Sequence, residues 1–522
     1  MELAATIAAL SDPRAFGRAA GVRVEVVQTH ISVVFLVEGD VYKLKKPVDL
    51  EFLDYSTVAR RRRCCELEVE LNRRLAPDVY LGTLPVVQVE GGLRVGGAGE
   101  AVDWVVHMRR LPDDARLIAR LEAGLVDAAL MRRIGARIAA FHRAARRGPE
   151  VSAWASFAAV AGNCRQNFAQ LAGLAAVPAA LLQRLERRTE EALAQGRAAI
   201  EGRARGQVAC DTHGDLRLDH IYWFPERAAP DDLLVIDCVE FSEQFRCADP
   251  VADLAFLVMD LHDARRGDLA EALLGSYFAA TPAAEVAEGR ALLPLYTAYR
   301  ATVRGKVDAF KASEPEVPAQ AQAEARAGAA RHLLLALREL APPAERPCLV
   351  LVIGLPGTGK STLARALADE GFAWVRSDAV RKQLAAGAAP GEGIYTAAWT
   401  ERTYAACLEQ ARARVLAGER VVVDANFKAD AQRRPFVALA RALGVPARIF
   451  VCTADDAAVR ERLTHRSGDV SDADVGVYLR AREEWQPLAP AHAALAETID
   501  TTGPREAVAP RVLASLRAAG LA

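Results

Sequence analysis

The sequence predicts a multidomain protein of two fold classes: an α+β region comes first, and an α/β region with a parallel, doubly wound sheet follows. The length of 522 residues corresponds to roughly three domains of about 150 residues each. Short apolar strands fill residues 22–48, helical patterns fill most of 116–340, and strands alternate with helices after 348. Such alternation is typical of a parallel sheet covered by helices on both faces.

The α+β region is predicted to contain two lobes. A β-meander over 22–48 is followed by a helical period over 57–75 and by strands around 84–89 and 103–108. A strand-rich island at 208–241 interrupts the later helices. The expected domains are a lobe of strands and one helix (1–112), a helical lobe (113–339), a Pro-rich linker (340–347) and the α/β domain (348–522).

Composition and charge exclude several classes of protein. Hydrophobic residues make up 52% and charged residues 25%, which argues against a disordered or collagen-like chain. Lys and Arg total 66 against 67 Asp and Glu, so the chain lacks the basic excess of proteins that coat nucleic acid or anionic membranes. We expect small-molecule acceptors as partners, with no membrane, nucleic-acid or protein partner.

The cysteines and the N-terminus predict a cytoplasmic protein. Nine scattered cysteines without a CxxC pair disfavour a disulfide framework and a zinc site. Glu2 stands where a signal peptide carries positive charge. No uninterrupted apolar run approaches the roughly 18 residues of a membrane span.

The strongest motif is Gly354-Leu-Pro-Gly-Thr-Gly359-Lys360-Ser361, which satisfies GxxxxGK[ST]. It follows an apolar strand and opens a helix, so backbone N–H groups and the helix N-terminus can bind phosphate. Lys360 can reach the β- and γ-phosphates of ATP, and Ser361 can ligate Mg²⁺. The alternative is a Gly-rich turn with an incidental Lys-Ser. The predicted nucleotide ligands are Gly354, Gly357, Thr358, Gly359, Lys360, Ser361 and Thr362.

Polar residues also follow the next two strands, where an open α/β sheet binds its ligand. Asp378 could accept a hydroxyl proton or hold Mg²⁺ through water, and Arg381 could bind an anionic acceptor. Alternatively, Ser377 and Asp378 cap the next helix. Asp424 ends the third strand and is expected in the metal shell.

A later segment carries Arg460, Arg462 and Arg466. These side chains either close over the phosphates as a lid, in which case Arg462 and Arg466 are nucleotide ligands, or form a solvated helix face. Together, the motifs over about 348–500 resemble the small P-loop kinases, a group that includes AAA-type domains and gluconate kinase-like, zeta toxin-like and polynucleotide 5′-kinase-like enzymes. The resemblance implies that Asp378 is the catalytic base and that Arg381 binds the acceptor. Lys360 completes the expected catalytic set.

A second set of phosphotransferase-type residues lies in the N-terminal half. The sequence His213-Gly-Asp215 and a later strand that ends in Asp237 supply two carboxylates, one for the acceptor hydroxyl and one for Mg²⁺. Further on, Asp249 and Asp253 could fix this loop by capping the next helix.

The β-meander supplies a lysine on its third strand. Lys43 and Lys45 project from the same strand face, so periodicity does not choose between them as phosphate ligand. The next helix offers Glu66 and Glu68 as partners, which is the Lys–Glu arrangement of the protein kinase-like core. The strand around 103–108 then corresponds to the hinge, whose backbone from Met108 to Leu111 would bind adenine.

These pieces resemble the aminoglycoside/choline phosphotransferase family over roughly 20–310. The resemblance implies a bilobal protein kinase-like fold in which Asp215 is the base, Asp237 holds Mg²⁺ and Lys43, paired with Glu68, binds the α- and β-phosphates. The whole chain resembles bacterial proteins in which such a domain is fused to a P-loop NTPase domain.

Two positions depart from this family. His220 replaces the usual Asn, and an imidazole is a poor ligand for Mg²⁺. His220 could contact the metal through water, favour Mn²⁺, or be a hydrogen-bonded loop histidine. The phosphate-covering loop, residues 29–32, contains no glycine, although Ser32 could still bind a phosphate.

Three hypotheses about function follow. The leading one is an ATP- and Mg²⁺-dependent kinase with two active phosphotransferase domains, with Mn²⁺ as an option in the N-terminal half. In the second, only the P-loop half is a catalyst and the N-terminal half is a regulatory ligand-binding module. In the third, the P-loop half phosphorylates nucleic-acid 5′-ends or a nucleotide sugar.

Overall fold

The computed structural model describes residues 2–50, 53–386, 394, 396–465 and 473–522. The chain forms two compact units. The N-terminal unit comprises residues 1–162 and 196–297, and the C-terminal unit comprises 163–195 and 298–522. Within the described ranges, no helix combines the length and hydrophobicity needed to cross a membrane.

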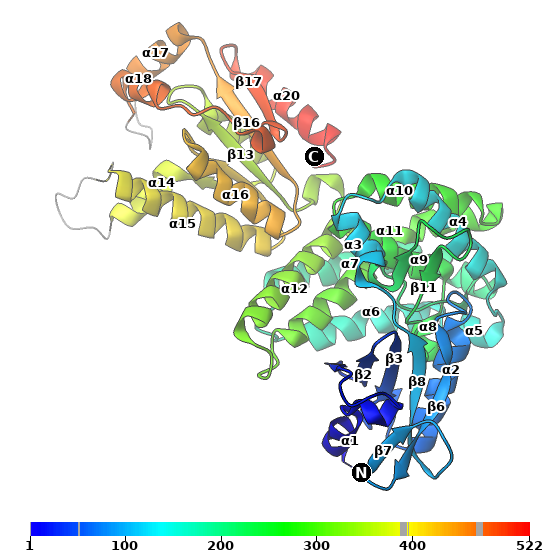
Figure 1. The fold of residues 1–522 in the computed structure, drawn as a ribbon. Helices are drawn as coiled ribbons and strands as arrows, with labels where there is room; N and C mark the ends of the chain where they lie inside the picture. The colour runs from blue at the N-terminus through cyan, green and yellow to red at the C-terminus, as the bar shows by residue number, and fades with distance from the viewer. Residues whose placement is uncertain (1, 51–52, 387–393, 395, 466–472) are drawn as a thin grey trace. The chain divides into compact units, whose positions relative to one another are not determined.

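The N-terminal unit contains an antiparallel sheet with the strand order β1-β2-β3-β8-β6-β7 (Figure 1). The predicted meander and both later strands are therefore present. The strands are β1 (Val24–Gln28), β2 (Ser32–Val37), β3 (Asp40–Lys45), β6 (Tyr80–Val89), β7 (Gly92–Val95) and β8 (Ala101–Arg109), with a separate pair β4 (Asp49–Leu50) and β5 (Leu53–Asp54).

The alternation of side chains along β3 decides what each face of this sheet carries. Tyr42 and Leu44 pack into one core with Phe35, beside α1 (Leu3–Leu10). Lys43 and Lys45 project from the opposite face, where α2 (Val58–Asn72) packs on β8 and β6. Both lysines are thereby directed toward the helix that carries Glu68.

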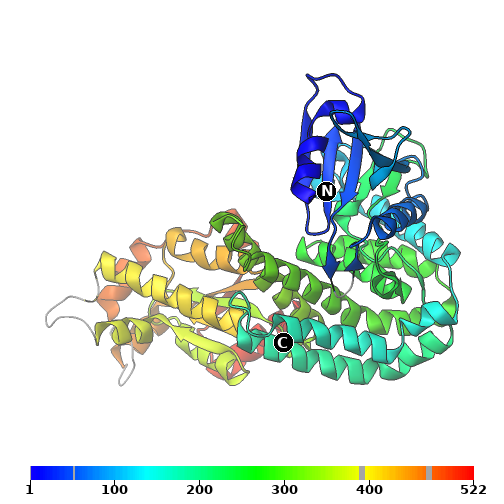
Figure 2. The same ribbon diagram turned by 90° about the horizontal axis from the view of Figure 1, so that it is seen from below.

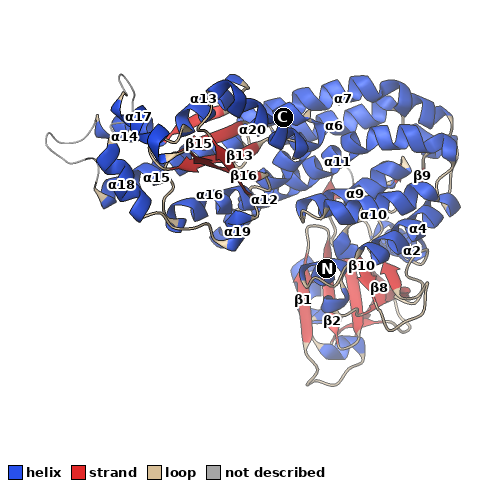
Figure 3. Cartoon of the chain, turned by 90° about the horizontal axis from the view of Figure 1, so that it is seen from above, coloured by secondary structure: helices blue, strands red, loops and turns tan. Residues whose placement is uncertain are grey.

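The rest of the N-terminal unit is mainly helical, as the sequence predicts, and its strands are short (Figure 3). Helices α4 (Ala128–Ala144) and α10 (Gly267–Ala279) approach closely at Gly135. A Cβ at this position would lie 2.4 Å from the backbone oxygen of Leu273, so only glycine fits there. The elements are α3 (Leu117–Glu122), α4 (Ala128–Ala144), α5 (Pro149–Ala153), β9 (Cys210–Asp211), β10 (Ile221–Trp223), β11 (Leu233–Val235), α8 (Glu243–Arg246), β12 (Cys247–Ala248), α9 (Pro250–Asp263) and α10 (Gly267–Ala279).

The C-terminal unit contains a parallel sheet with the order β14-β15-β13-β16-β17, which confirms the predicted α/β class. Every residue of the central strand β13 is buried. Val350 and Val352 face the core beneath α13 (Lys360–Asp369) and α20 (Arg505–Ala518), while α15 (Ala397–Leu416) and α16 (Asp430–Ala442) pack elsewhere on the sheet. The strands are β13 (Cys348–Gly354), β14 (Ala373–Arg376), β15 (Arg420–Asp424), β16 (Ala447–Thr453) and β17 (Ala496–Asp500).

Helices surround this sheet and extend the C-terminal unit. They are α13 (Lys360–Asp369), α14 (Ser377–Ala385), α15 (Ala397–Leu416), α16 (Asp430–Ala442), α17 (Asp456–Thr464), α18 (Val475–Glu483), α19 (Pro490–Ala493) and α20 (Arg505–Ala518). Four more contribute wholly or in part: α6 (Phe157–Leu171), α7 (Ala179–Arg205), α11 (Ala283–Lys311) and α12 (Ala319–Leu340).

The two units do not coincide with the domains expected from the sequence. Residues 163–195 and 298–339 were expected in the helical lobe, but they group with the α/β domain. Lys306 of α11 donates to Asn167 of α6 at 2.7 Å, and the two helices run side by side (Figure 2). Arg338 of α12 donates to the backbone oxygen of Gly444 at 3.2 Å. Residues 298–340 belong to the same compact unit as the P-loop sheet. The Pro-rich segment before β13 contains a 3₁₀ turn, Pro343–Glu345.

Candidate active sites

The P-loop connects β13 to α13 in the C-terminal unit, and its glycines are required by geometry. Gly354 has φ 144°, and a Cβ there would lie 2.4 Å from the backbone oxygen of Cys452 on the neighbouring strand. Gly357 and Gly359 have φ 81° and 79°, values that other residues rarely adopt. Thr358 donates to the backbone oxygen of Leu355 at 2.7 Å. These φ angles and the Thr358 hydrogen bond together define the conformation of the loop.

Lys360 and Ser361 open α13 and lie beside the end of β15. The Nζ of Lys360 donates to the backbone oxygen of Leu355 at 2.8 Å. Burial is the main reason that the pKa of Asp424 is raised, although Lys360 and a hydrogen bond from Ser361 partly offset it.

The Oδ2 of Asp424 is buried and has no hydrogen-bond partner among the described residues. An acceptor oxygen left open beside a serine hydroxyl suits a hydrated Mg²⁺ ion, so these residues fit the metal that the motif implies.

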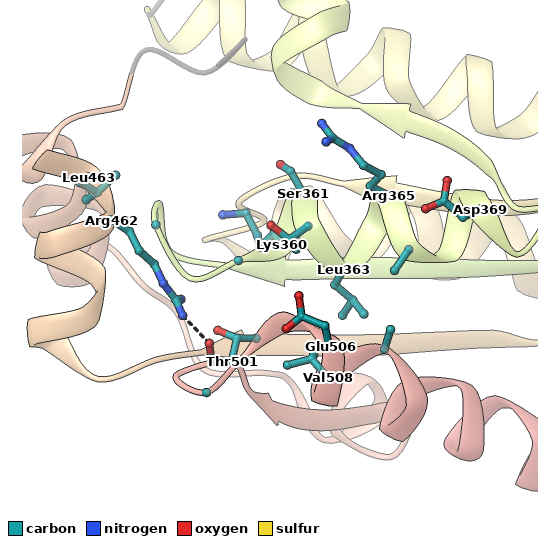
Figure 4. A pocket seen from close by; sticks show the side chains of 16 residues that line it. Lys360, Ser361, Leu363, Arg365, Asp369, Arg462, Leu463, Thr501, Glu506 and Val508 are labelled. Atoms are coloured by element: carbon teal, nitrogen blue, oxygen red, sulfur yellow. Dashed lines mark hydrogen bonds between the residues drawn. The ribbon is translucent and has the colours of Figure 1, made fainter. Parts of the chain in front are cut away.

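A cavity of about 760 Å³ opens along the P-loop (Figure 4). Arg462 of α17 lines it and donates to the backbone oxygen of Thr501 at 2.6 Å. Arg460 instead pairs with exposed Asp456, and Arg466 lies outside the described residues. Of the predicted ligands, Gly357, Gly359, Lys360, Ser361, Thr362 and Arg462 line the cavity, whereas Gly354 and Thr358 shape the loop.

Asp378 and Arg381 lie on α14, directly after β14. The helix already begins at Ser377, and the capping position is Arg376 without a side-chain hydrogen bond. The alternative that Ser377 and Asp378 cap this helix is therefore wrong. Arg381 donates to the backbone oxygen of Ile394 at 2.6 Å.

Sequence reasoning missed two residues near the P-loop. Thr501, just beyond β17, donates to the backbone oxygen of Thr358 at 2.8 Å and lines the cavity. Arg376 ends β14, and its Nε lies 3.9 Å from Oδ2 of Asp424. The rule that strand ends meet at one edge of a parallel sheet could have identified both.

The N-terminal unit brings Lys43 to the predicted acidic residues. Its Nζ lies 2.9 Å from Oε1 of Glu68 and 2.8 Å from Oδ1 of Asp237. Lys43 is the main reason that the pKa of Asp237 lies well below its usual range. Of the two glutamates proposed as partners, Glu68 makes the contact, and Glu66 pairs with Arg62 on the surface.

A second buried ion pair lies behind the first. Lys45 is fully buried and bonds Oε2 of Glu68 at 2.6 Å and, more closely, Glu240. Tyr55 donates to Glu240 at 2.5 Å. Lys43 is thus the lysine of the pair that keeps access to solvent, which favours it as the phosphate ligand. Sequence reasoning missed Glu240, because no motif marks it.

Asp253, on α9, fixes the His213-Gly-Asp215 loop through hydrogen bonds to its backbone. The two carboxylate oxygens of Asp253 accept from the backbone N–H groups of His213 and Gly214 at 3.0 and 2.9 Å. Burial alone raises the pKa of Asp253, but the hydrogen bond from His142 and the contacts with His213 outweigh it and hold the pKa at about 2. Asp249 caps α9 through the N–H of Val251 at 2.9 Å, as expected.

Asp215, His220 and Asp237 converge above this loop. The Nδ1 of His220 lies 3.6 Å from Oδ2 of Asp215, and its Nε2 lies 3.7 Å from Oδ2 of Asp237. Asp237 has φ 65°, an unusual value for a residue with a side chain, and a strained residue at such a place is typical of functional sites. Within the part of the chain that the structure describes, no group of three or more His, Cys, Asp or Glu side chains is arranged to hold a metal ion, so an ion at this place needs further ligands from a bound nucleotide or water.

The structure also describes the two segments expected to bind adenine and to cover the phosphates, residues 108–111 and 29–32. Met108 lies in β8 with its side chain buried, opposite Val41. The N–H groups of Arg109 and Arg110 already donate to backbone oxygens within the sheet. Ser32 is the first residue of β2 and is buried, and its N–H donates to Oγ1 of Thr29 in the preceding loop at 3.0 Å.

Comparisons with known proteins identify relatives along nearly the whole chain. A family model described as an AAA domain matches residues 349–488, which confirms the predicted P-loop domain. Uncharacterized proteins of Mycobacterium tuberculosis and Mycobacterium bovis are each 34% identical over 500 residues, which is 92% of this chain and 93% of the relative.

Solved structures match each half of the chain separately. A choline/ethanolamine kinase family protein from Mesorhizobium loti is 13% identical and covers 61% of this chain and 92% of its own length, with a TM-score of 0.36. A gluconokinase from Sinorhizobium meliloti 1021 is 20% identical and covers 33% of this chain and 94% of its own, with a TM-score of 0.26. These scores are too low to carry an inference about activity.

Proposed function

This chain belongs to the same family as the mycobacterial proteins, and from that premise we propose that it is an ATP-dependent phosphotransferase with two nucleotide sites. Each site transfers the γ-phosphoryl group of ATP to a hydroxyl group of a small molecule. The cytoplasmic location expected from the cysteines belongs to the same proposal.

One observation carries the proposal most strongly: the P-loop lies between a buried parallel strand and a helix, beside a cavity of about 760 Å³. The cavity receives Lys360 and Ser361 from the loop and Arg462 from α17. Cationic side chains and backbone N–H groups aimed at one cavity stabilise a polyphosphate.

At the P-loop site, Ser361 and Asp424 would hold Mg²⁺, which neutralises phosphate charge when bound. Lys360 and Arg462 stabilise the β- and γ-phosphates as negative charge shifts toward ADP. Asp378 accepts the proton of the acceptor hydroxyl as its oxygen bonds to the γ-phosphorus and the bond to the ADP oxygen breaks. Arg381 binds an anionic group of the acceptor.

At the N-terminal site, Asp215 acts as the general base that accepts the proton of the acceptor hydroxyl. Lys43, positioned by Glu68 at 2.9 Å, binds the α- and β-phosphates, and Asp237 would hold the metal ion. Asp253 keeps the loop before Asp215 in place through two backbone hydrogen bonds. As at the P-loop site, the acceptor oxygen bonds to the γ-phosphorus while the bond from phosphorus to the ADP oxygen breaks.

The test is ATP consumption by the full chain with a panel of small alcohols, in Mg²⁺ and in Mn²⁺. Lys360→Ala and Asp215→Asn are each expected to remove part of the turnover, and the double variant is expected to remove all of it. Lys311, exposed at the end of α11, gives the control Lys311→Ala. A wild-type protein that neither binds nor turns over ATP with any divalent metal would contradict the proposal.

A second candidate function is favoured by the charge arrangement around Lys43. Both Glu68 and Asp237 already bond its amine, and Ser32, at the start of the neighbouring strand β2, is buried. In this case the N-terminal unit binds a regulatory ligand and only the P-loop unit catalyses. Asp215→Ala would then leave turnover intact while Lys360→Ala abolishes it.

A further inference from the structure

His220 lies between the two carboxylates of the N-terminal site, at the end of a 3₁₀ turn, Leu218–His220. Its Nδ1 lies 2.8 Å from the backbone oxygen of Asp215. A carbonyl oxygen only accepts hydrogen bonds, so Nδ1 is the donor in this contact. The other nitrogen, Nε2, faces Asp237, and a hydrogen bond from one ring nitrogen is what orients the other toward a metal.

The Nε2 atom of His220 lies 3.7 Å from Oδ2 of Asp237. The other carboxylate oxygen, Oδ1, is bonded by Lys43 at 2.8 Å. Asp237 is 46% exposed, so an ion can reach it from solvent. An imidazole nitrogen and a carboxylate oxygen that face each other can both bind one cation placed between them.

The separation of these two atoms suits one metal ion. Divalent ions such as Mg²⁺ bind their ligands at about 2.1 Å, so two ligand atoms on one ion lie at most about 4.2 Å apart. The distance of 3.7 Å lies within that limit. Among the described residues, no group of three or more His, Cys, Asp or Glu side chains could hold a metal ion, so phosphate oxygens and water must complete the shell.

We propose that His220 Nε2 and Asp237 Oδ2 bind the same nucleotide-associated metal ion, and that this site therefore prefers a divalent first-row transition ion to Mg²⁺. Imidazole binds such ions well, whereas Mg²⁺ requires oxygen ligands. The C-terminal site offers the metal only oxygen, from Ser361 and Asp424, and keeps a preference for Mg²⁺. This inference rests on the proposed function, because the nucleotide brings the ion.

The test uses Mn²⁺ as a paramagnetic probe in the full chain, with Lys360→Ala to weaken nucleotide binding at the P-loop. With a non-hydrolysable ATP analogue, pulsed electron paramagnetic resonance is expected to detect ¹⁴N coupling from a coordinated imidazole. His220→Asn removes this coupling. His332→Asn, which changes a histidine of α12 paired with Asp308, keeps it.

Competition between metals gives a second readout. In His220→Asn, the preference for Mn²⁺ over Mg²⁺ is expected to fall about tenfold. Loss of a residue that only supports a metal ligand already lowers metal affinity about tenfold or more. Nucleotide-dependent Mn²⁺ binding without nitrogen coupling in the His220 protein overturns the inference and assigns His220 to an ion pair with Asp237. Absence of any nucleotide-dependent Mn²⁺ binding in the Lys360→Ala background overturns the N-terminal nucleotide site itself.

Discussion

The P-loop site and the Lys43 site hold their lysines in different ways. Lys360 donates to the neutral backbone oxygen of Leu355 at 2.8 Å. Lys43 instead bonds two carboxylates, Glu68 at 2.9 Å and Asp237 at 2.8 Å. A phosphate that binds Lys43 must therefore share its amine with two carboxylates, each of which carries a full charge.

The two sites also differ in how far apart their parts lie in the sequence. The P-loop contributes its ligands from residues 354–362, within one strand-to-helix connection. The N-terminal cluster joins Lys43 and Glu68 to Asp237 and Glu240, nearly 200 residues later. The comparison teaches that the first site depends on local backbone geometry, while the second depends on a buried network of charges.

The largest expected effect concerns the bases of the two sites. In an Asp215→Asn background, Asp378→Asn is expected to lower the remaining ATP turnover by about 10²–10⁴-fold, the usual contribution of a general base. Steady-state assays at saturating acceptor measure this. Asp474→Asn is the control, because Asp474 caps α18 through Val477. Equal rates for both variants would contradict the role of Asp378.

The second prediction tests the buried charges of the N-terminal unit. Glu240→Gln leaves Lys45 buried with a single carboxylate partner and is expected to lower the free energy of unfolding by about 3–5 kcal/mol. Glu66→Gln breaks an exposed pair with Arg62 and is expected to cost under about 1 kcal/mol. Urea unfolding of both variants measures the difference, and similar costs would show that the network is not needed.

The third prediction concerns pH. The folded-state pKa of Asp253 is about 2, below its ordinary 3.8, so its stabilisation is present above pH 4 and is lost as the pH falls through 2. The shift corresponds to about 2 kcal/mol. The gap in unfolding free energy between wild type and Asp253→Asn should narrow by that amount between pH 5 and 2. A constant gap would contradict the pairing with His142.

The smallest effect separates the two arginines of α17. Arg462 reaches Thr501 beside the cavity, whereas Arg460 pairs with Asp456 on the surface. Arg462→Ala is expected to raise the KM for ATP about tenfold, since a hydrogen bond to a charged group contributes about 1.5 kcal/mol. Arg460→Ala should leave KM unchanged. A larger rise in the KM for ATP in Arg460→Ala than in Arg462→Ala would contradict the role of Arg462 as the nucleotide ligand.

Much of the fold was predictable because its patterns are local. The alternation along 22–48 and 103–108 predicts the strands of the N-terminal sheet, and the apolar runs after 348 predict a parallel sheet. The motif containing Lys360 is contiguous, so its strand-to-helix setting follows from the sequence. The extent of the second unit was not predictable, since α11 and α12 pack on partners distant in sequence.

The sequence by itself determined which residues can do the chemistry: a P-loop with Lys360, and an acidic loop with Asp215. Only the tertiary structure distinguished the surroundings of Lys43 and Lys45, since both lie on one face of β3 and Lys45 is the one that is fully buried beside Glu240. It also placed His220 Nε2 opposite Asp237. Periodicity fixes the face of a strand, but burial and ion pairing arise only when distant segments pack together.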